Sequence, residues 1–94
     1  MRKVEGELIV SNSRNKFYIA VGGEIVAQIE FVLDDRIVIA QTLVADHCRG
    51  KGLGKSLIDR VVLYARNEHK SVQAICPFAQ MILGNEKKYR DVLI

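Results

Sequence analysis

The fold of this sequence is decided by the stretch Arg49-Gly50-Lys51-Gly52-Leu53-Gly54-Lys55-Ser56. Its three glycines let a main chain approach a phosphate without a side-chain clash. Its three cations place positive charge around the same point. A strand precedes the stretch and a helix follows it, so that free N–H groups and the helix dipole favour an anion there. The stretch therefore predicts a phosphate-binding loop rather than a solvated glycine-rich connection.

Two common nucleotide-binding loops do not fit this stretch. A Walker A loop requires a glycine five positions before Gly54, where the sequence has Arg49. The dinucleotide fingerprint G-x-G-x-x-G fails because the third glycine comes one residue early. Both nucleotide-binding folds also require more than the 94 residues present.

Upstream of the loop, four segments rich in Ile, Val, Phe and Tyr have the length of strands. They cover residues 7–11, 16–21, 24–33 and 36–44. Turn signals separate them at residues 12–15, at Gly22-Gly23 and at Asp34-Asp35. This half of the chain predicts a four-stranded antiparallel meander.

Downstream of the loop, apolar residues recur at helical spacing over residues 53–69. Residues 72–76 predict a short strand that Pro77 stops, because proline cannot donate to a strand ladder. Residues 78–83 predict a helix that ends at Gly84, and residues 86–93 a second helical piece. The whole chain, residues 1–94, predicts one α/β (α+β) domain without repeats or linkers.

Composition limits the function classes. The chain is 49% hydrophobic and 27% charged, which excludes the disordered class. No apolar run approaches the roughly 18 residues of a membrane span, and residues 1–6 do not resemble a secretory signal. Cys48 and Cys76 lack metal-type partners, which favours a reducing cytoplasm over a disulfide or metal site. A net charge of +3 permits an anionic ligand and does not by itself indicate nucleic acid.

The pattern Arg49-x-x-Gly52-x-Gly54 resembles the pyrophosphate loop of the GNAT N-acetyltransferases, [QR]-x-x-G-x-[GA], which binds coenzyme A. The order of elements is also similar to that fold. The short length and the run Cys76-Pro77-Phe78-Ala79 look like the small GNAT-like proteins of fewer than about 110 residues. The resemblance covers the chain from about Phe17 to its end.

The resemblance implies acetyl-CoA or coenzyme A as the cofactor, an amine as the acetyl acceptor and no metal. Leu43 and Val44 would hydrogen-bond the pantetheine arm through their main chain. The strands before the loop and after the helix splay apart in this fold, and Cys76 would lie beside the thioester in the gap. The pyrophosphate would be held by the backbone N–H groups from Arg49 to Lys55. The cofactor-binding residues expected at the loop are Arg49, Gly50, Lys51, Gly52, Leu53, Gly54, Lys55 and Ser56.

Three positions depart from the family pattern. Leu83 stands where many GNAT enzymes have a tyrosine that protonates the leaving thiolate. Gln41 stands where small members often carry a histidine. Residues 12–15 leave no room for the helices with which larger members grip the acceptor. The cofactor half of the family pattern is present, and the acceptor half is nearly absent.

Two interpretations of Cys76 stay open. A thiol close to a thioester can accept the acetyl group and pass it on, provided that its pKa is lowered enough to form thiolate. A cysteine that ends an apolar strand is also typical of a small buried hydrophobic residue. Weaker candidates are Tyr89 as a substitute acid, Glu30 as a base through water, and His47 as a phosphate contact; packing or solvation explains each.

The sequence thus predicts an acetyl-CoA-dependent N-acetyltransferase, by direct transfer or through a Cys76 acyl-enzyme. The alternative is a non-catalytic coenzyme A-binding module that acts through a partner protein. A nucleic-acid-binding domain rests only on Lys51, Lys55 and the basic run Lys87, Lys88 and Arg90, without the interleaved aromatics that stack bases. We therefore expect no nucleic acid or membrane partner, and a monomer or weak dimer.

Overall fold

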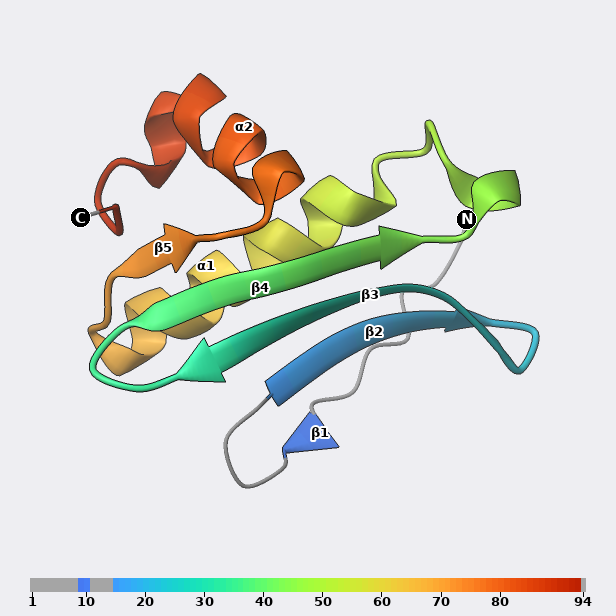
Figure 1. Cartoon of the computed structure of the whole chain (residues 1–94), viewed down its shortest axis with the longest axis horizontal. Coiled ribbons are helices and arrows are strands. Elements are labelled where there is room, and N and C mark those ends of the chain that lie inside the picture. The colour runs from blue at the N-terminus through green and yellow to red at the C-terminus, as the bar shows by residue number, and fades with distance from the viewer. Residues whose placement is uncertain (1–8, 11–14, 94) are drawn as a thin grey trace.

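The computed structural model describes residues 9–10 and 15–93 of the chain. Five strands form one sheet in the order β1-β2-β3-β4-β5 (Figure 1). Neighbouring strands are antiparallel except β4 and β5, which run parallel. The elements are β1 (Ile9–Val10), β2 (Asn15–Val21), β3 (Glu24–Leu33), β4 (Ile37–Val44), the 3₁₀ turn η1 (Asp46–Cys48), α1 (Leu53–Glu68), β5 (Val72–Ala74), α2 (Pro77–Asn85) and the 3₁₀ turn η2 (Lys87–Tyr89).

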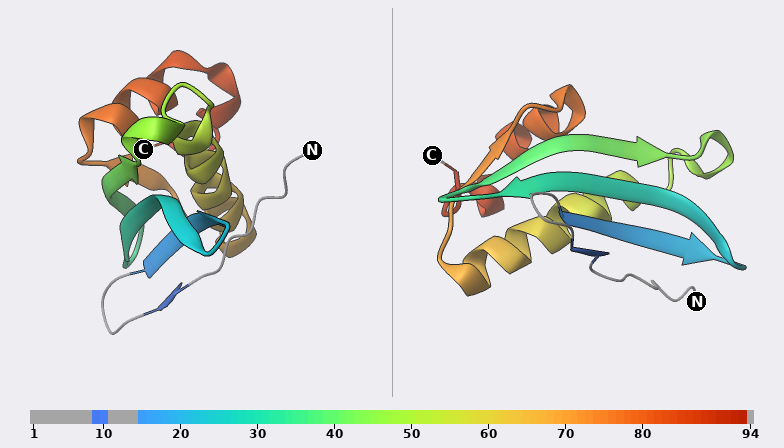
Figure 2. Two further views of the ribbon diagram at one scale, coloured as in Figure 1. Left: turned by 90° about the vertical axis from the view of Figure 1, so that its right-hand side faces the viewer. Right: turned by 60° about the horizontal axis from the view of Figure 1, so that its bottom comes forward.

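The core lies between one face of the sheet and α1 (Figure 2). Alternate residues of the strands are buried on this face, among them Phe17, Ile29 and Ile39. α1 buries Leu57 and Val61 against them, with further apolar positions one turn apart. α2 packs beside β5 and β4 and also contacts α1. Among the described residues, no helix covers the opposite face of β2 and β3 (Figure 1).

A β-bulge in β4 changes which residues face α1. Ile39 pairs with Phe31, but the next pair joins Gln41 to Glu30, so Ala40 is an extra residue on β4. Without the bulge, strict alternation would turn Gln41 toward the core. With it, Gln41 is exposed and Thr42, opposite the buried Ile29, faces the helix side.

The predicted meander and long helix are confirmed, and α1 ends one residue earlier than expected. The predicted first strand overlaps β1, while its remainder and the turn at residues 12–14 lie outside the described residues. The helix predicted for residues 78–83 is confirmed as α2, which begins at Pro77 and ends at Asn85, one residue beyond the expected end at Gly84. Cys76 lies beyond β5, as the N-cap of α2.

The second helical piece predicted for residues 86–93 is much shorter than expected. Only η2 forms there, and the chain then turns toward the sheet. Val72 donates its N–H to the Val92 carbonyl at 2.7 Å, and Leu93 forms a parallel bridge with Val72. Pairing with the outer edge of β5 and burial of Tyr89 and Val92 override the local helical preference.

Candidate cofactor site

The predicted loop ends at an open helix N-terminus. Gly52 is the N-cap of α1 with φ 79°, and no side chain of the described residues caps it. The Ser56 N–H bonds to the Gly52 carbonyl at 3.0 Å as the first helical bond. The N–H groups of Leu53 and Gly54 precede that bond, so helix geometry leaves them without a carbonyl partner one turn earlier. This end of α1 presents donors and a positive dipole end to an incoming anion.

The loop glycines have two different structural roles. Gly50 and Gly52 have φ 81° and 79°, which a residue with a side chain adopts only under strain, and a Cβ at either would meet nothing within 4 Å. Gly54 has no such backbone requirement. A Cβ at Gly54 would lie 2.7 Å from Cε2 of Phe78, so the glycine is needed for the close approach of the α2 ring.

A pocket of about 520 Å³ lies at this helix end. It is formed by the end of β4, the loop and the first turns of α2. Its lining residues are Thr42, Val44, Cys48, Arg49, Gly50, Gly52, Leu53, Gly54, Lys55, Phe78 and Ile82. The structure therefore brings most of the predicted cofactor-binding residues to one cavity.

Four predicted site residues do not line this pocket. Leu43 is 47% exposed and, by its register opposite Gln28, lies on the face of the sheet away from α1. Lys51 is exposed at the tip of the loop, and Ser56 turns toward a different hollow. Cys76 is 8% exposed and lies behind the lining.

Two of the three loop cations already contact groups of the chain. Arg49 donates from Nε to the Val44 carbonyl at 3.4 Å, and its guanidinium lies 3.5 Å from the Asp46 carboxylate. The Lys55 ammonium lies 2.7 Å from the carboxylate of Glu86, the residue that follows α2. This contact raises the pKa of Lys55 and lowers the pKa of Glu86. An anion entering the pocket would meet both cations with these partners in place.

Cys76 occupies the point where β4 and β5 separate. The ladder between them ends at the pair Ile39 and Ala74, after which the N–H groups of Ile75 and Cys76 both donate to the Ile39 carbonyl. The Cys76 Sγ lies 3.7 Å from the Thr42 Oγ1 across the gap.

The environment of Cys76 favours the thiolate. Burial alone raises the pKa of the Cys76 thiol. Hydrogen bonds from the Ala79 backbone and the Thr42 side chain act in the opposite sense, with smaller contributions from the backbone of Phe78 and Thr42. The hydrogen bonds prevail and hold the pKa of this thiol below its ordinary value.

The weaker candidates lie outside the pocket. Tyr89 is 1% exposed, and its hydroxyl donates to the Asp59 carboxylate on α1. Burial and this bond raise the pKa of Tyr89. Glu30 lies 3.5 Å from Lys16 on the face of the sheet opposite α1. His47 is exposed in η1.

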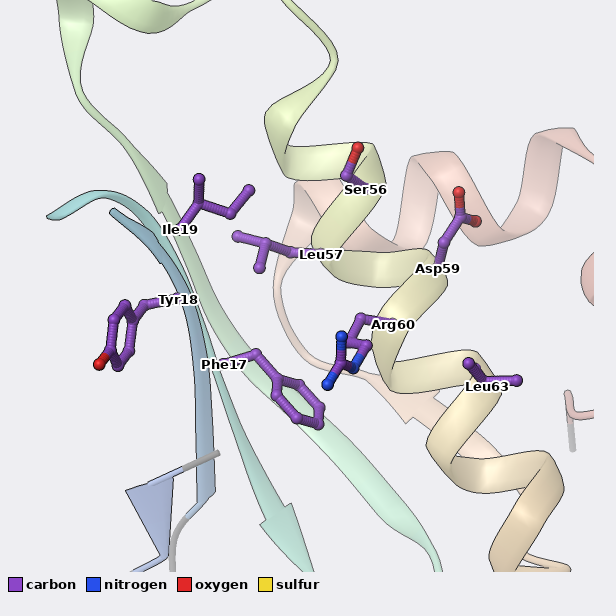
Figure 3. Close-up of a pocket in the computed structure, with 8 residues that line it drawn as sticks. All are labelled: Phe17, Tyr18, Ile19, Ser56, Leu57, Asp59, Arg60 and Leu63. Atoms are coloured by element: carbon purple, nitrogen blue, oxygen red, sulfur yellow. The ribbon is translucent and has the colours of Figure 1, made fainter. Parts of the chain in front are cut away.

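A second hollow of about 330 Å³ lies between β2 and α1 (Figure 3). Leu57 and Arg60 reach from the helix toward Ile19 and Phe17 on the strand, and the Arg60 guanidinium lies 5.1 Å from the centroid of the Phe17 ring. Ser56 is the one residue of the predicted loop in its lining. This hollow is separate from the cofactor pocket.

Sequence reasoning missed Thr42, Ile82 and Glu86 at this site. Thr42 faces the pocket only because of the bulge at Ala40, which no local pattern indicates. Ile82 and Glu86 reach the site through the packing of α2, which is a tertiary feature. In the part of the chain that the structure describes, no group of three or more His, Cys, Asp or Glu side chains could hold a metal ion. No helix of the described residues is long and apolar enough to cross a membrane.

Comparison with known proteins agrees with this geometry. The family described as GCN5-related N-acetyl-transferase matches residues 16–92. A GCN5-like protein from Staphylococcus aureus, solved by NMR, superposes with a TM-score of 0.73 at 33% identity, over 94% of this chain and 87% of that one. No curated protein matches the sequence at a significant level.

Two further structures share the fold at lower identity. A ribosomal-protein-alanine N-acetyltransferase from Brucella melitensis has a TM-score of 0.65 at 23% identity, over 71% of this chain and 54% of that one. A Bacillus anthracis protein in complex with acetyl coenzyme A has a TM-score of 0.61 at 17% identity, over 70% of this chain and 39% of that one. The chain thus spans about half or less of these two proteins.

The chain belongs to the GCN5-related N-acetyltransferase family. The expected α/β fold, in which the loop opens a helix between two diverging strands, is confirmed. Family membership supports an acetyltransferase.

Proposed function

We propose that this chain binds acetyl-CoA in the pocket at the start of α1 and transfers its acetyl group to an amine. The observation that carries the proposal is the open helix N-terminus within a pocket of about 520 Å³ that extends between the end of β4 and the first turns of α2. A long cofactor with an anionic end and an apolar arm matches such a pocket. The acceptor amine is unassigned.

The residues present fit this cofactor. A pyrophosphate at the loop would receive N–H bonds from residues 50–55 and charge from Arg49 and Lys55, while the N–H groups of Arg49 and Ser56 already bond to the carbonyls of Asp46 and Gly52. The open space at Gly50 and Gly52 is where a phosphate can approach the main chain. Val44 would offer main-chain groups to the pantetheine arm, and its carbonyl can accept a second hydrogen bond beside the one from Arg49. We retain Leu43 only as a main-chain contact, since its side chain lies on the other face.

Two routes for the acetyl group remain in competition at Cys76. In direct transfer, the amine attacks the thioester and Cys76 packs beside it. In the acyl-enzyme route, the Cys76 thiolate attacks the thioester carbonyl, coenzyme A leaves as its thiolate, and the amine then takes the acetyl group from sulfur. The lowered pKa of the Cys76 thiol favours the second route, and its burial favours the first.

A second candidate function is a non-catalytic coenzyme A-binding module that acts through a partner protein. Only residues 11–14 separate β1 from β2, which is too short for the acceptor-binding helices of larger family members. Leu83 stands in place of the family's tyrosine acid, and its side chain is buried in the core. By these features, the chain has the groups expected to bind the cofactor and lacks the elements with which larger members bind the acceptor.

Intact-mass spectrometry with acetyl-CoA separates these possibilities. We expect wild type to form a native complex. An acetyl group that survives denaturation in wild type and Cys48→Ser, but not in Cys76→Ser, would establish the acyl-enzyme. A complex without covalent acetyl would leave direct transfer, to be tested with an amine panel; no turnover of any amine would favour the binding module. Absence of any complex would overturn the proposed function.

A further inference from the structure

Thr42 stands where the cofactor pocket and the Cys76 thiol meet. Its side chain lines the pocket, and its Oγ1 lies 3.7 Å from the Cys76 Sγ. Cys76 itself is 8% exposed and behind the lining. Thr42 is therefore a polar side chain that joins the cavity to the buried sulfur.

The backbone fixes this position of Thr42. The bulge at Ala40 turns Thr42 to the helix side, opposite the fully buried Ile29. β5 has already left the sheet at this level, because its last pair with β4 is Ala74 with Ile39. The space vacated by β5 is taken by Cys76 and the first turn of α2. The contact between Thr42 and Cys76 thus depends on two separate features, the bulge and the divergence of the strands.

A hydroxyl suits both protonation states of the sulfur. In the neutral form the Cys76 S–H donates to the Thr42 Oγ1. When the thiol ionises and its proton passes to solvent, the hydroxyl can rotate and donate its own O–H to the sulfur anion, since a hydroxyl is both donor and acceptor. Backbone groups of Phe78 and Ala79, at the start of α2, approach the sulfur from the other side.

We propose that Thr42 is a positioning residue that holds the Cys76 sulfur at the pocket and stabilises its thiolate. The proposal rests on the proposed function for its purpose, because a thiolate at this place matters only if a thioester binds beside it. The ionisation of the Cys76 thiol beside Thr42 involves only groups of this chain. It can therefore be measured without any cofactor.

The test compares Thr42→Val, which keeps the shape and removes the hydroxyl, with Thr42→Ser, which keeps the hydroxyl. Both are made in a Cys48→Ser background so that Cys76 is the single thiol. NMR of ¹³Cβ-labelled cysteine reports ionisation across pH without requiring access to the buried sulfur. At pH values below the midpoint of the Cys76 titration, we expect Thr42→Val to lower the thiolate fraction by about 3- to 10-fold. This is the loss of one hydrogen bond of ordinary strength, as suits the long contact of 3.7 Å. Thr42→Ser should restore most of the thiolate fraction.

An unchanged titration in Thr42→Val would overturn the proposal, as would an equal change in Thr42→Ser, which would assign the effect to packing. If Thr42→Val does not fold, Thr42→Ala replaces it, and the same comparison with Thr42→Ser decides. A coenzyme A titration of the wild type, followed by backbone NMR, tests the proposed function independently. If Thr42→Val alters the Cys76 titration but coenzyme A does not bind, the role of Thr42 stands and the proposed function is rejected. If coenzyme A binds but the Cys76 titration is unaltered, the proposed cofactor stands and the role of Thr42 is rejected.

Discussion

The two ends of α1 are built in opposite ways. At the C-terminal end, the His69 N–H bonds to the carbonyls of Ala65 and Arg66, and the Lys70 N–H also reaches Ala65. Arg66 adds a two-pronged contact with Asp91 at 2.8 and 2.9 Å. At the N-terminal end no side chain of the described residues caps the helix, and glycines surround the free donors. The chain satisfies one end with its own groups and leaves the other uncapped within the described residues, which is where we propose that the cofactor binds.

If the proposed function holds, local stability and ligand binding are separated along one helix. Changes at open-end positions that face free space, such as Gly52, should alter cofactor binding with modest effect on the free energy of unfolding. Changes along the closed end and its attached C-terminal segment, residues 86–93, should do the opposite. Four substitutions can break or sharpen this division.

The largest effect is expected for Gly52→Glu. A carboxylate among the free N–H groups would repel a pyrophosphate, and juxtaposed like charges cost several kcal/mol, so affinity for coenzyme A should fall about 100-fold or more. Gly23→Glu is the matched control, because Gly23 has φ 81° and open space like Gly52 but lies in the turn between β2 and β3. Isothermal titration should show loss of binding in Gly52→Glu alone; equal loss in both would indicate backbone strain and remove the loop assignment.

Gly54→Ala should follow, with an effect on stability. The new methyl would lie 2.7 Å from the Phe78 ring, and such overpacking costs about 1–3 kcal/mol, partly offset by the helix preference of alanine. Gly84→Ala in α2 is the control, since its methyl meets open space and should stabilise by about 0.5–1 kcal/mol. Urea unfolding measures both variants. A Gly54→Ala protein as stable as wild type would show that the ring moves freely.

The meander and α1 were predictable because their signals are local. Gly22 and Gly23 have positive φ in the turn that the sequence indicated, and α1 keeps an apolar stripe at helical spacing. His69 as a left-handed C-cap with φ 56° was within one residue of the expected helix end. Such features depend on neighbours in the sequence, and alternation or turn chemistry is enough to locate them.

The inner wall of the site was not predictable in the same way. The loop was found from its glycines and cations, but the role of Gly54 depends on a ring contributed by α2. Thr42 faces the pocket because of a bulge that forms between two strands. Gln41, which stands at the position of a family histidine, is exposed for the same reason. Pairing and packing over long sequence separation decide these positions, which no short pattern encodes.

Tyr89→Phe tests the closed side of α1 and should lower the free energy of unfolding by about 1–2 kcal/mol, because it removes a hydrogen bond to the half-exposed Asp59 carboxylate. Burial and Asp59 raise the pKa of Tyr89 above its ordinary 10.0. The associated stability is therefore fully present below pH 10.0 and is lost as pH rises toward the higher folded value. Unfolding followed from pH 7 to 11 should show this loss in wild type and not in Tyr89→Phe, while coenzyme A affinity stays unchanged in the variant at neutral pH.

The smallest effect concerns Glu86, which belongs to the C-terminal segment but contacts the open end of α1. Its carboxylate lies 2.7 Å from the Lys55 ammonium, at the pocket, and opposes an incoming phosphate. Because the pair is partly exposed, Glu86→Gln should raise coenzyme A affinity only about 2- to 5-fold, and the gain should shrink as salt increases. Glu68→Gln makes the same charge change at the far end of the same helix and should leave affinity unchanged. An equal gain in both variants would mean that net charge alone is responsible, whereas weaker binding in Glu86→Gln would show that Glu86 orients Lys55 for the phosphate instead of competing with it.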